Sequence, residues 1–306
     1  MKILIVCSKN SGKIAPFILE QGESLQRSGV EIDYYPIIGK GVRGYWKNRK
    51  SFLQKIKTFQ PDIIHAHYGL SGLLANTQRD IPVVTAYHGS DINTSGLFIL
   101  SRLNMVLSAH AIFVSNENKL KSGLSRNFTL LPCGVDTKTF VPGVKEESRK
   151  LLGLEKDQKF VLFSSAFDIA VKNSELALSA LELLPDVRLI ELKNYSRSQV
   201  ALLMNAVDVA LMTSFTEGSP QFIKEAMACN CPVVSVPVGD VPFVLDGVEG
   251  CFIAAYNAVD VAEKLKMAFM FDKRTEGRNR ILELGWSTEK VAEKLLILYN
   301  DILGTK

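Results

Sequence analysis

The stretch TSFTEGSPQFIKEAMACNCPVVSVPVGD, residues 213–240, combines charged side chains with a loop that leads into a helix. Glu217 lies in the loop, Pro220 suits the first helical position because its missing N–H is not needed there, and Glu225 falls in the early turns. Asn230 suits a left-handed residue after the helix. A positive helix end between two carboxylates predicts a diphosphate site, with the carboxylates accepting bonds from sugar hydroxyls. Two solvated surface glutamates are the alternative.

A second candidate loop follows the apolar run in KILIVCSKNSGK, residues 2–13. It is not a P-loop, because Cys7 replaces the first glycine and Ile14 replaces the metal-binding hydroxyl. A dinucleotide fingerprint fails too, since Gly12 is the only glycine of the loop. What remains is a strand-to-helix loop that aims helix N–H groups at an anion.

Other chemistry-bearing residues give weaker signals. His65 and His67 lie on one face of an expected strand and could begin a metal site, but the chain has 4 histidines and no further cluster completes it. No G-x-S-x-G elbow accompanies the Ser, His and Asp residues. We expect no metal, and we expect the 5 cysteines to be buried, reduced thiols.

Short apolar runs alternate with helix-length segments along the whole chain, which predicts β-α-β units and an α/β fold with parallel sheets. Expected strands are 2–7, 31–35, 62–66, 83–86, 111–115, 128–131, 160–165, 187–191, 207–212 and 232–236. Expected helices include 14–28, 44–59, 172–184, 197–206, 219–230 and 258–271.

The alternation lapses at residues 130–150, where Pro, Gly and charge predict a linker. We therefore expect two doubly wound, Rossmann-like domains, 1–145 and a shortened 146–306, with the final helix returning to the first domain. Ligands of such folds bind beyond the carboxyl ends of the strands, so a central cleft is the expected site.

Composition agrees with a well-buried globular protein of two domains, since the 306 residues are 47% hydrophobic with a mean hydropathy of +0.11. No segment reaches the roughly 18 apolar residues of a membrane helix. Residue Met1 leads directly into a strand pattern without a cleavage site, so we expect a cytoplasmic protein.

Positive charge concentrates near the N-terminus. Residues 1–140 carry 17 Lys and Arg against 9 Asp and Glu, and residues 39–57 carry seven cations and no acid. With Tyr45, Trp46 and Phe52 among them, these cations predict an interfacial element for anionic lipid at the inner face of the membrane, or for an anionic acceptor. A solvated helix face is the alternative. No recognition motif points to nucleic acid.

The paired glutamates, followed by AMACNCPVV, resemble the Glu-x7-Glu signature of the retaining glycosyltransferases of the large family 4, which have the GT-B fold. The resemblance spans nearly the whole chain. Further matching segments, in order, are PDIIHAHYGLSG, IPVVTAYHGSDIN, LLPCGVDTKTFVP and GWSTEKVAEKLLILYNDIL.

The resemblance implies a role for each matching residue. Glu225 would bind the ribose hydroxyls of a nucleotide sugar of UDP or GDP type, and Glu217 would face the transferred sugar. Lys172 would neutralise the departing diphosphate, His88 would lie near the donor sugar, and Gly12 would lie against the diphosphate.

Neighbouring residues complete the expected site. Gly218 and Ser219 continue the donor loop. Asp91 orients His88, caps the helix that begins near residue 93, or contacts phosphate or acceptor.

Three features depart from the family pattern. Ala166 stands where a phosphate-binding arginine is usual, so either Lys172 would carry more of the load or Lys9, Lys13 or Arg102 would compensate. The interval from 172 to 217 is short by roughly one βα unit, on the order of 30 residues. Phe243 replaces an acid.

The resemblance implies a retaining, metal-independent hexosyltransferase that uses a glycan or lipid-linked acceptor in surface polysaccharide or glycolipid synthesis. The residues leave two alternatives open: a nucleotide-sugar 2-epimerase on the same fold, and a non-catalytic partner subunit that binds a sugar nucleotide. The missing arginine motivates the second.

Overall fold

The computed structural model describes residues 1–304 and divides the chain into two compact units. Unit 1 is Met1–Gly134 together with the chain from Thr288, and unit 2 is Val135–Ser287. The final helix therefore belongs to unit 1, and the boundary expected between residues 145 and 146 falls inside unit 2.

Unit 1 is built on a parallel six-stranded sheet in the order β2-β1-β3-β4-β5-β6. Its strands are β1 Lys2–Ser8, β2 Glu31–Ile37, β3 Ile63–His67, β4 Val83–Tyr87, β5 His110–Phe113 and β6 Phe128–Leu130. Its helices are α1 Pro16–Arg27, α2 Gly41–Trp46, α3 Arg49–Phe59, α4 Gly69–Ala75, α5 Ser90–Asn93, α6 Ser95–Leu107, α7 Asn116–Ser122 and α15 Thr288–Gly304.

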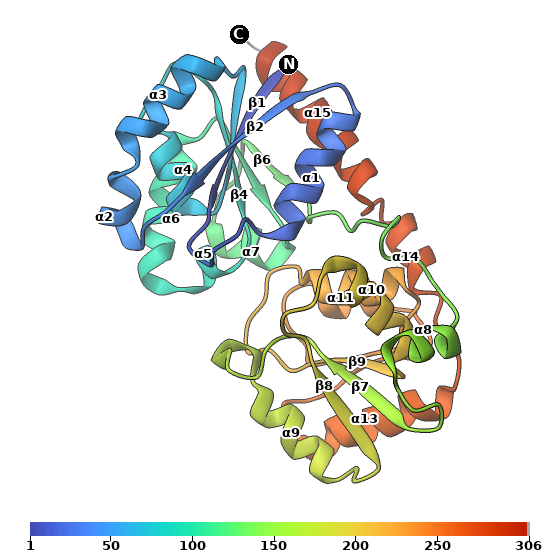
Figure 1. The fold of residues 1–306 in the computed structure, drawn as a ribbon. Helices are drawn as coiled ribbons and strands as arrows, with labels where there is room; N and C mark the ends of the chain where they lie inside the picture. The colour runs from blue at the N-terminus through green and yellow to red at the C-terminus, as the bar shows by residue number, and fades with distance from the viewer. Residues whose placement is uncertain (305–306) are drawn as a thin grey trace. The chain divides into compact units, whose positions relative to one another are not determined.

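The last helix completes the core of unit 1. Helix α15 lies beside α1 (Figure 1), and its buried residues Val291, Leu295 and Tyr299 pack in one apolar cluster with Ile3 and Ile5 of β1. Because β1 is apolar on both faces, it needs a helix layer on each side, and α15 supplies part of one layer.

Unit 2 has a parallel five-stranded sheet in the order β11-β10-β9-β7-β8. Its strands are β7 Lys159–Phe163, β8 Val187–Glu191, β9 Val209–Met212, β10 Val233–Ser235 and β11 Cys251–Ile253. Its helices are α8 Lys145–Leu152, η1 Ala170–Lys172, α9 Ser174–Glu182, α10 Arg197–Ala206, α11 Gln221–Ala228, α12 Val241–Leu245, α13 Ala258–Phe271 and α14 Gly277–Glu283. Strand β11 was not expected.

The two sheets share a strand order that creates a switch point. In unit 1 the order reverses between β1 and β3, and in unit 2 between β7 and β9, because the second strand of each series lies on the far side of the first. Such points open a crevice at the carboxyl ends of the strands, and ligands bind there.

Several element boundaries differ from expectation. The helix expected over 44–59 is interrupted, with α2 ending at Trp46 and α3 beginning at Arg49. Pro220 is the N-cap of α11 rather than its first residue. Asn230 does adopt the expected left-handed backbone, with φ 55°.

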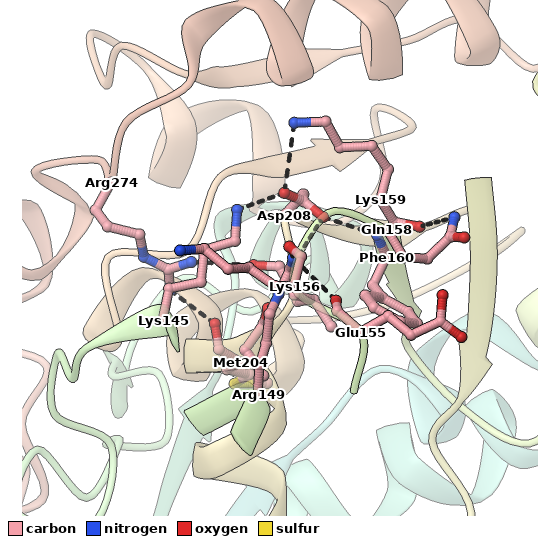
Figure 2. Close-up of polar contacts among 12 residues, drawn as sticks. Lys145, Arg149, Glu155, Lys156, Gln158, Lys159, Phe160, Met204, Asp208 and Arg274 are labelled. Atoms are coloured by element: carbon pink, nitrogen blue, oxygen red, sulfur yellow. Dashed lines mark hydrogen bonds and ion pairs between the residues drawn. The ribbon is translucent and has the colours of Figure 1, made fainter. Parts of the chain in front are cut away.

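A buried charge network holds α8 against the sheet of unit 2 (Figure 2). Arg149 Nη2 donates to Asp208 Oδ2 at 2.8 Å, and the Phe160 N–H donates to the same oxygen at 2.7 Å. Lys145 also pairs with Asp208. Asp208 precedes β9 and Phe160 lies near the start of β7, so this network is at the amino ends of the strands, away from the switch point, and its role is structural.

Residues 1–304 include no helix that combines the length and apolarity of a bilayer span.

Candidate functional site

The switch point of unit 2 brings Lys172 against the loop that follows β9. Thr213 Oγ1 donates to the carbonyl oxygens of Lys172 and Asn173, at 3.1 and 2.8 Å. The Phe215 N–H donates to Val171 O at 2.9 Å. These bonds join the loop after β7 to the loop after β9, so the backbone places the lysine.

The first pair of charged side chains at this point is Lys172 and Glu217. Lys172 Nζ lies 2.6 Å from Glu217 Oε1, and both side chains are partly buried. A charge-assisted bond of this length in a partly dehydrated place is strong. The lysine and the first motif glutamate therefore act as one unit.

The segment Gly218–Ser219 is held from the neighbouring strand end by Gly239 and Asp240. The Asp240 N–H donates to Gly218 O at 3.1 Å. Gly239 has φ 58°, and a Cβ added there would lie 2.4 Å from Gly218 O. Only glycine permits this approach, so the shape of the Gly218–Ser219 loop depends on residue 239.

A buried lysine supports the same loop. The Lys224 side chain is 1% exposed, and its Nζ donates to Ser219 Oγ at 3.2 Å. Burial raises the pKa of the Asp240 carboxyl to about 6, and the Lys224 ammonium limits that rise. An acid and a lysine thus lie together behind the Gly218–Ser219 loop.

Glu225 has an arginine partner. The glutamate is 4% exposed, and its Oε1 accepts a bond of 2.5 Å from Arg197 Nη2. The Arg197 guanidinium also lies over the Phe140 ring, 4.5 Å from its centroid. Arg197 is the first residue of α10, whose start is set by the capping box of Ser196 and Gln199.

We call Lys172, Arg197, Glu217, Lys224 and Glu225 the charged cluster. Arg197 and Lys224 were not predicted. Lys224 could have been noticed as a cation among the apolar residues of α11, whereas the partner of Arg197 lies 28 residues away on another helix, and no spacing rule indicates it.

Residue 166, where an arginine was expected, is the uncharged Ala166. Among the described contacts of unit 2, the cations paired with the two motif glutamates are Lys172 and Arg197. The suggested substitutes Lys9, Lys13 and Arg102 are all exposed and belong to unit 1.

The loop after β1 is a tight turn whose residues 9–13 are exposed. Gly12 has φ 88°, its N–H donates to Lys9 O at 3.0 Å, and nothing lies within 4 Å of an added Cβ. The Asn10 side chain exchanges two bonds with the backbone of Gly39, at 2.9 and 2.8 Å, and so ties this loop to the end of β2. Lys13 is exposed beside it.

A row of three imidazoles lies at the ends of β3 and β4, and we call His65, His67 and His88 the imidazole row. The rings of His65 and His67 are stacked, with centroids 4.6 Å apart. His67 Nδ1 lies 3.0 Å from His88 Nε2. Burial lowers the pKa of His65 to about 4 and lowers the pKa of His67 well below its ordinary value. Both rings are therefore neutral.

Asp91 binds main-chain groups. Its Oδ1 accepts from the N–H groups of His88 and Gly89 at 3.0 Å, and its Oδ2 accepts from Gly69 N–H at 3.1 Å. Burial raises its pKa to about 6. The residue is 4% exposed and both of its carboxylate oxygens accept main-chain bonds, so it shapes the loop that carries His88.

The basic segment 39–57 presents fewer aromatic residues than expected. Tyr45 and Phe52 are buried in the core under α2 and α3, which corrects the prediction that both are interfacial. Trp46 is 61% exposed, Val42 is exposed on the same segment, and Ile38 is exposed directly before it.

The comparisons with known protein families cover both units. A profile described as "Glycosyltransferase Family 4" matches residues 5–139, and one described as "Glycosyl transferases group 1" matches residues 155–269. D-inositol 3-phosphate glycosyltransferase of Mycobacterium marinum is 26% identical over 247 residues, which cover 64% of this chain and 53% of the relative. The chain spans about half the length of that relative.

Solved structures with the same fold include sucrose-phosphate synthase from Thermosynechococcus elongatus, with a TM-score of 0.85 and 17% identity over 100% of both chains. Anabaena Alr3699/HepE in complex with UDP has a TM-score of 0.78 and 14% identity, over 98% of this chain and 100% of that one. These structures have the GT-B fold, and so does this chain.

Proposed function

Because this chain belongs to glycosyltransferase family 4, we propose that it transfers a sugar from a nucleoside diphosphate sugar to an acceptor hydroxyl. The observation that carries the proposal is the Lys172–Glu217 pair, which lies in the loops that follow β7 and β9, the two strands at the switch point of unit 2. A family motif and an independent rule of fold topology thus point to one place.

We assign the donor to unit 2. Glu225, with one oxygen bonded to Arg197, offers its second oxygen to the ribose hydroxyls. Lys172 moves from Glu217 to the diphosphate when the donor binds, and Glu217 then faces the hydroxyls of the transferred sugar. Gly218 and Ser219 contribute main-chain groups. The base is of UDP or GDP type, and Anabaena Alr3699/HepE, solved with UDP-glucose, supports the first.

The chemistry needs positive charge at the leaving group. Breaking the anomeric C–O bond develops positive charge on the sugar and negative charge on the diphosphate, which Lys172 and helix N–H groups stabilise. The acceptor hydroxyl attacks from the side of the departing diphosphate, a diphosphate oxygen takes its proton, and the anomeric configuration is retained. The side chains can supply this charge without a metal ion.

We assign the acceptor, a glycan or lipid-linked hydroxyl, to unit 1, with His88 and the Gly12 loop contributing to the reaction. The relatives named for D-inositol 3-phosphate support a hydroxyl-rich, anionic acceptor as one possibility to assay. Surface polysaccharide or glycolipid synthesis is the expected pathway.

A membrane surface is a separate proposal. Exposed Trp46 and Val42 lie within the segment of seven cations, residues 39–57, and exposed Ile38 directly precedes it, which suits an interface with anionic lipid. Sedimentation with phosphatidylglycerol vesicles tests it at low salt. Neutralising Lys47, Arg49 and Lys50 together should abolish retention.

The control for that experiment neutralises three exposed lysines of unit 2, Lys150, Lys266 and Lys273, and should leave retention unchanged. Equal loss in both triple variants, or no retention of the wild type, rejects the membrane proposal.

The transferase proposal is tested with a panel of UDP- and GDP-sugars and acceptors, with products identified by mass spectrometry. A glycosylated acceptor with loss of the nucleotide supports transfer. A C2 epimer formed without acceptor identifies the epimerase, and nucleotide binding without turnover identifies the partner subunit.

A further inference from the structure

The hydrogen-bond partners of His88 restrict where its proton lies. Its Nε2 lies 3.0 Å from His67 Nδ1, and its Nδ1 lies 3.7 Å from Cys133 Sγ. The first is a normal hydrogen-bond distance and the second is a weak contact with sulfur. One proton lies between the two imidazoles. The ring nitrogen that carries it determines whether His88 can donate or accept a hydrogen bond at its other nitrogen.

Burial decides the state of His67. The ring is fully buried, and its pKa is well below the ordinary value, first through burial and then through its histidine neighbours. A neutral imidazole carries a single proton, on either Nδ1 or Nε2. The Nε2 atom of His67 has no hydrogen-bond partner within residues 1–304.

The orphaned nitrogen selects one tautomer. With the proton on Nε2, His67 would bury an N–H donor that has no acceptor. With the proton on Nδ1, it donates to His88 and leaves only a bare nitrogen inside the protein. Buried donors without acceptors are rarer than under-satisfied acceptors, so the second arrangement is favoured.

We infer that His67 is a positioning residue that keeps the proton of His88 on Nδ1. Because His88 Nε2 accepts from His67, a neutral His88 ring carries its own proton on Nδ1, which lies 3.7 Å from Cys133 Sγ. A substrate oxygen can displace that sulfur. His88 therefore serves as a hydrogen-bond donor and not as a general base.

This inference rests on the proposed function only where it says that His88 donates a hydrogen bond to a substrate. The tautomer itself is measured without substrate. Long-range proton–nitrogen correlation spectra of the ¹⁵N-histidine-labelled protein distinguish protonated from bare ring nitrogens, and the chain has only 4 histidines to assign. Loss of a signal in His88→Gln identifies residue 88.

The expected spectrum shows His88 with Nδ1 protonated and Nε2 bare. His67→Asn keeps a hydrogen-bond donor near the position of Nδ1 and should therefore keep that pattern. His67→Leu removes the donor, so the proton of His88 should no longer be confined to Nδ1. His65→Asn is the matched control, because His65 bonds to Tyr299 OH and not to His88. A wild-type His88 protonated on Nε2, or a pattern unchanged in His67→Leu, overturns the inference.

Kinetics give the second readout, once an acceptor and donor are identified. His67→Leu should lower kcat by about tenfold or more, the size of a lost positioned proton donor, with KM little changed, and His67→Asn should restore most of kcat. A correct tautomer with an inactive wild type would reject the proposed function and leave the proton assignment standing. Equal losses of kcat in the Asn and Leu variants would reject the positioning role.

Discussion

At the scale of single residues, we propose that the charged cluster supplies the positive charge that an arginine at residue 166 would have given. Lys172 is bonded to Glu217, and Arg197 is bonded to Glu225, so each motif glutamate already has a cationic partner in this structure. A buried or half-buried carboxylate needs such a partner. The arginine that pairs with the second glutamate comes from α10, and the two ion pairs orient both carboxylates.

Gly239 offers a sharp test of the donor loop. Gly239→Ala brings a Cβ to 2.4 Å from Gly218 O, so the loop must shift. We expect donor KM to rise by about tenfold, the equivalent of roughly 1.4 kcal/mol. Gly247→Ala is the matched control, since Gly247 also has a positive φ, 74°, but nothing within 4 Å. Equal effects of the two changes on KM would show that backbone strain alone is responsible.

Residue-scale prediction from sequence succeeded for some positions and failed for others. Asn230 was predicted from local turn chemistry, which depends on its own φ. Tyr45 and Phe52 were misjudged, because a charged neighbourhood in sequence does not say which face of a short helix is buried. Arg197 was not predicted, because its contact with Glu225 depends on how α10 packs beside α11.

At the scale of elements, the strand order explains where the candidate site residues lie. In unit 2 the candidate loops follow the first and third strands of the series, β7 and β9. In unit 1 they follow β1 and β4, and His65 and His67 lie on β3, between these two strands in the sheet. The alternation of apolar runs predicted the strands and hence the edge of the sheet at which they end. It did not predict that the 3-10 turn Ala170–Lys172 would be bonded to the loop after β9, because those bonds join segments 40 residues apart.

Strand β3 carries an unusual pH dependence. His65 has its pKa lowered by burial from 6.5 to about 4, so between these values the unfolded chain binds a proton that the folded protein does not. The stability of the wild type therefore loses up to about 3 kcal/mol from this group as pH falls from 7 to 4.

His65→Asn keeps a donor for Tyr299 and removes the titration, so its unfolding free energy relative to wild type should rise as the pH falls through this range. Urea unfolding at pH 7, 5.5 and 4 measures the difference. A difference that is the same at all three values contradicts a neutral, buried His65.

At the scale of the whole molecule, the chain leaves unit 1 once and returns to it with α15. Leu295 is buried in unit 1 although it lies beyond the last residue of unit 2, and Asp208 holds α8 within unit 2. Each unit thus has its own core and its own structural contact. The sequence predicts two halves and the return of the last helix, but it places the boundary after residue 145, whereas unit 2 begins at Val135.

The two units should respond separately to damage. Leu295→Ala should destabilise unit 1 by about 2–5 kcal/mol through the cavity that it leaves. Asp208→Asn should destabilise unit 2 by about 3–5 kcal/mol, because Arg149 and Lys145 lose their counter-charge. Hydrogen exchange followed by mass spectrometry resolves the units. Faster exchange throughout both units in either variant would contradict this independence.

The most direct test of the central claim is calorimetric binding of UDP, GDP and their sugar conjugates to the wild type, Lys172→Ala and Glu225→Gln. The wild type should bind one nucleotide class, and each variant should weaken that binding by about tenfold or more, since each loses a charge-assisted contact. Lys266→Ala, an exposed change on α13, serves as the control and should bind as the wild type does. Wild-type affinity in both cluster variants would contradict the assignment of the donor to the charged cluster.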